Sequence, residues 1–127
     1  MIPPYGIRAG WRVLVRSTPK NPFHPKENDE ATMPKGYIIG HITVNDPDAY
    51  KEYIERDTPI LTALGGQFVV RGGQSEVVEG KTFQRHVVIE FSSYAKAIAA
   101  YNDPEYQQVA DIRRRTADSV ILVVEGV

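Results

Sequence analysis

The strand-like segments between Met33 and Val127 have an unusual second face, which is too apolar for water and too charged for an ordinary core. Successive side chains of a β-strand point to opposite faces of a sheet, so alternation sorts the residues into two sets. The first set is nearly all apolar, whereas the second mixes large apolar side chains with ionisable ones. The pattern predicts a sheet with helices on one face and a partner surface on the other.

The first part of the chain differs from the rest, because six of the nine prolines fall within its first 34 residues. These prolines interrupt any long periodic pattern, and no acidic residue precedes Glu27. We expect residues 1–32 to form a loosely ordered, Pro-rich basic extension and residues 33–127 to form one folded domain. Two alternatives stay open: a mitochondrial-type targeting segment, which the early prolines disfavour as a helix, and a start of translation at Met33.

The first half of the domain is predicted to be a strand followed by a helix. The strand covers residues 37–44 and ends at Asn45-Asp46-Pro47, which offers a cap followed by proline at a first helical position. Large residues then recur at helical spacing until Gly65-Gly66, which ends the helix. We expect Pro59 to kink this helix or to divide it.

The next segments are predicted to form an antiparallel hairpin. Its strands cover residues 67–71 and 83–91, with a bulge at Gly72-Gly73 and a tip at Glu79-Gly80-Lys81. A turn at these glycines would bring the two strands side by side.

A second helix and a last strand complete the domain. Ser92 or Ser93 caps the helix, Asp103-Pro104 restarts it, and the strand covers residues 118–125. The resulting β-α-β-β-α-β order predicts an α+β, ferredoxin-like fold, in which a four-stranded antiparallel sheet carries two helices on one face.

Several short motifs occur in order along residues 36–126. They are Asp48-Ala49-Tyr50, Gly65-Gly66, Val70-Arg71-Gly72-Gly73, Glu79-Gly80, Val88-Ile89-Glu90-Phe91, Pro104-Glu105-Tyr106-Gln107 and Val124-Glu125-Gly126. On these motifs the segment resembles the bacterial family catalogued as domain of unknown function 1330, a member of the dimeric α+β barrel superfamily. The resemblance implies a dimeric barrel. That superfamily includes cofactor-free monooxygenases, lactone isomerases, haem enzymes and effector-binding domains, so it implies architecture rather than chemistry.

Alternation assigns the strand residues to faces. The set expected to meet the helices is Ile38, Ile42, Val44, Phe68, Val70, Val87, Ile89, Phe91, Val120, Leu122 and Val124. The opposite set is Tyr37, Ile39, His41, Thr43, Val69, Arg71, His86, Val88, Glu90, Ile121, Val123 and Glu125. Leaving the apolar members of the second set in water would forgo roughly 1.5 kcal/mol or more apiece, so we expect a homodimer that covers this face.

The polar members of the second set are the predicted site. In this sheet His41 is expected beside Glu90 or His86 on one side and Glu125 on the other, with Arg71 across the hairpin. A carboxylate beside an imidazole raises its basicity, and an arginine grips a carboxylate or enolate oxygen. The expected catalytic residues are therefore His41, Arg71 and Glu90. The expected ligand-binding residues are His86, Glu125, Gly72, Gly73, Tyr101 and Tyr106.

Two functions are consistent with this polar face. The first is a pocket for a small organic molecule, with proton transfer or cofactor-free oxidation as its chemistry. The second is a dimerisation or stress-associated module, in which Arg71 with Glu90 and His41 with Glu125 are purely structural ion pairs. Tyr101 and Tyr106 lie at helical spacing, which is more often typical of packing residues than of ligand-binding ones.

Composition argues against other classes of function. The chain has no cysteine, and its three histidines lack the close spacing of metal ligands, so no metal or cofactor is expected. With 15 basic and 16 acidic residues it has no global field for nucleic acid or membrane, and we expect a cytoplasmic protein. The run Arg113-Arg114-Arg115 is typical of a solvated helix end, although a nucleic-acid accessory using it is an alternative.

Overall fold

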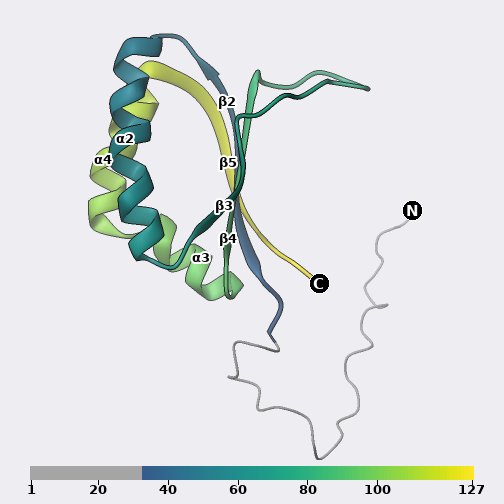
Figure 1. Cartoon of the computed structure of the whole chain (residues 1–127), viewed down its shortest axis with the longest axis vertical. Helices are drawn as coiled ribbons and strands as arrows, with labels where there is room; N and C mark the ends of the chain where they lie inside the picture. Colours follow the sequence, from purple (N-terminus) through teal and green to yellow (C-terminus); the bar gives the residue numbers. More distant parts are fainter. Residues whose placement is uncertain (1–32) are drawn as a thin grey trace, which may run out of the picture. The chain divides into compact units, whose positions relative to one another are not determined.

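The computed structural model describes residues 33–127, and the predictions made for residues 1–32 lie outside the described residues. The strands are β2 (Gly36–Val44), β3 (Gln67–Arg71), β4 (Arg85–Phe91) and β5 (Ala117–Glu125). The helices are α2 (Pro47–Ala63), α3 (Tyr94–Tyr101) and α4 (Pro104–Thr116). The antiparallel sheet has the order β3-β4-β2-β5, and the helices lie on one of its faces (Figure 1). The predicted ferredoxin-like α+β fold is confirmed.

Short polar residues set where the helices begin. The side chain of Asp46 accepts a hydrogen bond of 3.2 Å from the backbone N–H of Ala49, and Ser93 and Asp103 cap α3 and α4 in the same way. Because Asp103 begins a new helix, the predicted second helix is two consecutive helices. By contrast, α2 continues through Pro59 as one element, so this proline does not divide the helix.

The core lies between the helices and the face of the sheet that they cover, here called the helix face. Phe91, Leu61 and Val109 are its largest fully buried side chains. The chain packs closely at Gly36, where a Cβ atom would lie 2.3 Å from the backbone oxygen of Ser93. No helix of residues 33–127 lies over the opposite side of the sheet, here called the open face (Figure 1).

The predicted faces of β5 are wrong. Val120, Leu122 and Val124 lie directly opposite His41, Ile39 and Tyr37 of β2, so all six share the open face. Ile121 and Val123 instead pack against the core. Every residue from Val120 to Val124 is apolar, so alternation in the sequence carries no information about which set faces inward. Which set of β5 side chains faces the helices is determined by the register of β5 with β2.

The predicted faces at the end of β3 are also wrong. The register with β4 shifts between Phe68 and Val70, which marks a bulge earlier in the chain than the expected one at Gly72-Gly73. After the bulge Val70 lies opposite Val88 on the open face, and Arg71 lies opposite Val87 on the helix face. One extra residue reverses the direction of every following side chain, which explains the error.

Candidate functional site

The open face does not assemble the predicted catalytic cluster. Glu90 and His41 share this face, but Glu90 lies opposite Tyr37, and the Tyr37 hydroxyl donates a hydrogen bond of 3.3 Å to its carboxylate. His41 lies opposite His86, one of its two predicted neighbours, with 3.0 Å between their Nδ1 atoms. Arg71 belongs to the helix face and therefore cannot join them.

Glu125 is also misplaced in the prediction. It lies opposite Gly36, at the far end of β2 from His41. Residues at this register position point to the helix face of the sheet, not to the open face. Neither structural ion pair expected from the sequence, Arg71 with Glu90 or His41 with Glu125, forms among residues 33–127. The prediction from alternation failed for Glu125 because β5 pairs with β2 in a register that places Val120, not Glu125, beside His41.

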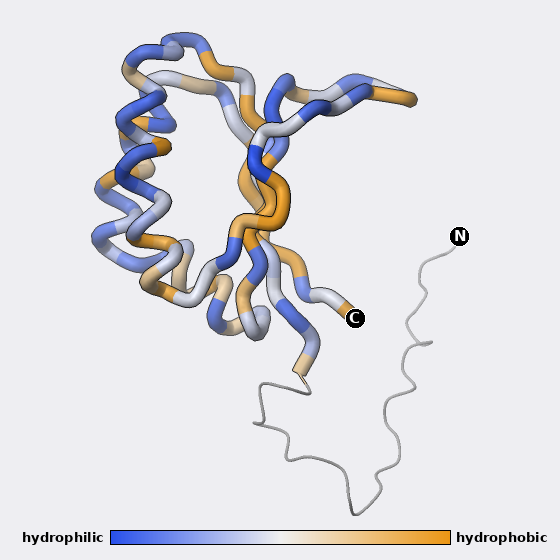
Figure 2. Tube along the Cα trace, viewed as in Figure 1, coloured by the Kyte–Doolittle hydropathy of each residue, from blue (hydrophilic) through white to orange (hydrophobic). Residues whose placement is uncertain are grey.

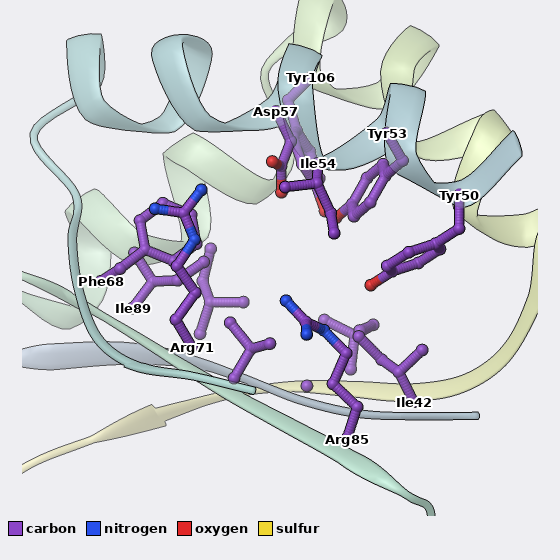
Figure 3. Close-up of a pocket in the computed structure, with 14 residues that line it drawn as sticks. Ile42, Tyr50, Tyr53, Ile54, Asp57, Phe68, Arg71, Arg85, Ile89 and Tyr106 are labelled. Atoms are coloured by element: carbon purple, nitrogen blue, oxygen red, sulfur yellow. The ribbon is translucent and has the colours of Figure 1, made fainter. Parts of the chain in front are cut away.

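A cavity lies on the other side of the sheet, between α2 and the strands (Figure 3). About 30 Å³ of it can be occupied by the centre of a water-sized molecule, and the cavity opens in part to solvent. Its lining residues are Ile38, Gly40, Ile42, Tyr50, Tyr53, Ile54, Asp57, Phe68, Arg71, Arg85, Val87, Ile89, Tyr106 and Ile121. Apolar walls with a few converging polar groups are typical of small-molecule sites.

Asp57 is the acidic group of this cavity. It comes from the buried stripe of α2 and is only 5% exposed. Burial raises the pKa of its carboxyl from 3.8 to about 6, although hydrogen bonding to Thr58 and Tyr53 and the charges of two arginines act in the opposite direction. A carboxylate with a pKa near 6 is largely ionised at pH 7 and still basic enough to accept a proton.

The two arginines that act on Asp57 are Arg71 and Arg85, which reach the cavity from neighbouring strands (Figure 3). The guanidinium of Arg71 stacks 4.4 Å from the centroid of the Phe68 ring and donates a hydrogen bond to the Thr58 hydroxyl. Arg85 lies beside Tyr50, and its buried Nε has no hydrogen-bond partner among the described residues. One acid and two arginines give the lining a net charge of +1, which suits a ligand with a negative charge.

Tyrosine hydroxyls form the inner end of the cavity. Those of Tyr53 and Tyr106 lie 2.8 Å apart in a buried hydrogen bond. Burial raises the pKa of Tyr53 well above its ordinary value, so this hydroxyl stays protonated. Behind the pair lies Arg113, which is 3% exposed and donates to the Ser119 hydroxyl at 2.9 Å, while its Nε and Nη2 atoms have no partner among residues 33–127.

The remaining predicted ligand residues have other positions. Tyr106 lines the cavity, whereas Tyr101 is half-buried and packs its ring 5.9 Å from that of Tyr106. Gly72 has a φ of +68°, and a Cβ there would lie 2.1 Å from a terminal nitrogen of Arg85, so it makes room for that guanidinium. Gly73 has open space around it.

Sequence reasoning missed Asp57, Tyr50, Tyr53 and Arg85 as site residues. A signal for Asp57 was present, because it fills the gap in the helical stripe between Tyr53 and Leu61 and so had to face the core. Arg85 likewise continues the inward alternation that runs through Val87, a residue assigned to the core. Both positions place a charge where the pattern requires an apolar side chain, and such conflicts are expected at functional sites.

No group of three or more histidine and acidic residues in the described range could hold a metal ion. None of its helices combines the length and apolar character of a membrane span.

Comparisons with known proteins agree with the fold. Residues 35–127 match the model of a family described as a domain of unknown function (DUF1330). A protein of unknown function from Rhodopseudomonas palustris superimposes with a TM-score of 0.60 at 18% identity, covering 82% of this chain and 95% of that one. No curated protein gave a significant match.

Two further solved structures share the fold. A dimeric ferredoxin-like protein of unknown function from Thermobifida fusca gives a TM-score of 0.53 at 16% identity, covering 74% of this chain and 92% of that one. SnoaB, a cofactor-independent oxygenase from Streptomyces nogalater, gives 0.52 at 15% identity, covering 72% and 91%. At these identities the likeness concerns the fold alone.

Proposed function

The chain belongs to the DUF1330 family, and we propose that it binds a small organic acid or enolisable carbonyl compound in the cavity on the helix face. The observation that supports this proposal most is that a buried carboxylate, Asp57, lines the same apolar cavity as the exposed Arg71 and the half-buried Arg85. The proposed site differs from the polar open face, on which a ligand was expected from the sequence.

The division of roles follows from chemistry. Arg71 and Arg85 pair with a carboxylate or enolate oxygen, while the isoleucines and Phe68 enclose the apolar body of the ligand. Asp57 accepts a proton from the carbon next to the ligand carbonyl, because its carboxyl has a pKa of about 6. The arginines then stabilise the negative charge that develops on oxygen.

Binding is tested by a thermal-shift screen of small carboxylic acids, phenols and lactones. The wild type should be stabilised by members of the panel that Arg85→Met and Arg71→Met no longer recognise. Arg115→Met is the matched control, because Arg115 is exposed on α4 and away from the cavity. If ligands stabilise all four proteins equally, or none at all, binding in this cavity is refuted.

Proton transfer is tested separately, by following the loss of ligand α-proton signals in D₂O with NMR. Wild type should catalyse the exchange and Asp57→Asn should not. If a ligand binds in the cavity but its α-protons do not exchange, the protein would be a binding module without catalytic activity, which is the non-enzymatic alternative.

Cofactor-free oxidation is a second candidate. It is supported by the fold shared with SnoaB, a cofactor-independent oxygenase, and by the proposed proton removal from carbon, which would leave a carbanion to react with O₂. Oxygen consumption with a bound, proton-exchanging ligand would favour this chemistry over simple isomerisation.

We also propose that the protein is a homodimer that pairs its open faces. One row of apolar side chains crosses all four strands on this face: Val70, Val88, Ile39 and Leu122. Val70 and Leu122 are 43% and 37% exposed in the single chain, although such side chains favour burial. The neighbour from Thermobifida fusca is described as dimeric.

A further inference from the structure

The segment between β3 and β4, residues 72–84, extends away from the sheet as a long arm. In Figure 1 the arm leaves the sheet on the side opposite the helices, which is the side of the open face. Residues 73–83 make no backbone–backbone hydrogen bond with any residue described. An arm with free backbone groups is a ready surface for contact with another chain.

The end of the arm is apolar. Val77 is 50% exposed and Val78 is 88% exposed, and the hydrophobic colour at the tip in Figure 2 marks the same place. The fold of the single chain leaves these two apolar side chains largely in water. Burying both against a partner would stabilise the complex by roughly 1.5 kcal/mol or more each.

The arm is continuous with the open face. It starts directly after β3 and returns into β4, the two strands whose Val70 and Val88 begin the apolar row. Two sheets that pack face to face lie about 10 Å apart. The seven residues from Gly72 to Val78 span up to roughly 20 Å when extended, so the tip reaches past the sheet of a second copy.

We propose that the arm is a clasp, which lays Val77 and Val78 against a second copy of this chain. The inference rests on the proposed pairing of open faces and adds the contact that holds the pair. In a two-fold dimer each arm would grip the other subunit, so four valines contribute.

Sedimentation velocity of Val77→Ser/Val78→Ser tests the clasp. The dimer dissociation constant should rise at least 10-fold, with an unchanged far-UV circular dichroism spectrum. The matched control is Gln74→Ser/Thr82→Ser, which changes two exposed polar residues of the same arm and should dissociate like the wild type. Equal dissociation constants for both variants and the wild type would overturn the clasp, whereas a monomeric wild type would overturn the pairing of open faces itself.

The absence of cysteine from the chain allows a direct test of what the tip contacts. A photo-crosslinker is attached to Val78→Cys, and isotopically heavy and light proteins are mixed before illumination. Crosslinks between heavy and light peptides support the clasp, and their sites identify the surface that the arm holds. Crosslinks confined within single chains, or none in a sample shown to be dimeric, would refute it.

Discussion

Gly72 leaves the space that the guanidinium of Arg85 occupies, since a Cβ at residue 72 would lie 2.1 Å from its Nη1 atom. The glycine also has a φ of +68°, a conformation that other residues adopt at a cost. Its backbone N–H donates a hydrogen bond of 2.8 Å to the carbonyl of His86, which fixes this turn beside the cavity. Gly72, the residue at which the arm begins, therefore limits the positions that the Arg85 guanidinium can take.

Gly72→Ala should displace Arg85 and weaken ligand binding. We expect a loss of about 1 kcal/mol in the free energy of unfolding from the left-handed backbone alone. Gly73→Ala is the matched control, because a Cβ there meets nothing within 4 Å. Denaturant unfolding and thermal shifts with a ligand measure both effects; equal behaviour of the two variants would contradict the role given to Gly72.

Asp57 should make the stability of the protein depend on pH. Its folded-state pKa is raised from 3.8 to about 6, so between these values the folded state binds more protons than the unfolded one. The contribution of Asp57 to the free energy of unfolding is therefore most favourable below pH 4 and falls as the pH rises to 6, by up to about 3 kcal/mol.

Asp57→Asn should lack this fall, whereas Asp48→Asn, at an exposed position of the same helix, should keep it. Urea unfolding between pH 3.5 and 7.5 measures the difference. If the Asp57→Asn and wild-type curves run parallel, the carboxyl is not held in the environment described.

The Tyr53 and Tyr106 hydroxyls should be energetically coupled. Removing the Tyr53 hydroxyl leaves that of Tyr106 buried without this partner, at a cost of about 1–3 kcal/mol, whereas the double variant Tyr53→Phe/Tyr106→Phe removes both hydroxyls of the pair. A double-mutant cycle in denaturant measures the coupling. Additive losses would show that the 2.8 Å hydrogen bond contributes nothing to stability.

Leu122→Lys should dissociate the homodimer. The change places a charge in the apolar row that crosses the four strands, where pairing of open faces would bury it, so we expect at least a 10-fold rise in the dimer dissociation constant. Thr62→Lys adds the same charge to an exposed position of α2 and serves as the control. Light scattering that shows both variants equally dimeric would place the interface elsewhere.

The order of the elements could be predicted from the sequence because local signals define it. Asp46-Pro47 and Asp103-Pro104 begin helices, and Gly65-Gly66 follows one, for reasons that depend on a few neighbouring residues. Clear alternation in β2 and β4 likewise gave the correct face for Ile38 and Ile89, both of which are buried.

The site could not be assembled in the same way, because it depends on register. A single bulge after Phe68 moved Arg71 to the helix face, and the uniformly apolar β5 concealed which of its side chains point inward. Asp57 and Arg85 come together only when α2 lies over the strands, a tertiary relationship that no short motif encodes.

The most direct test of the account is NMR of isotopically labelled protein during titration with a panel of small aromatic and aliphatic carboxylic acids. We predict saturable shifts of the Arg71 and Arg85 side-chain signals and of the Asp57 backbone amide, with the His41 and His86 signals unmoved. Saturable shifts centred on the two histidines, or no saturable shift at either arginine, would contradict a ligand site on the helix face.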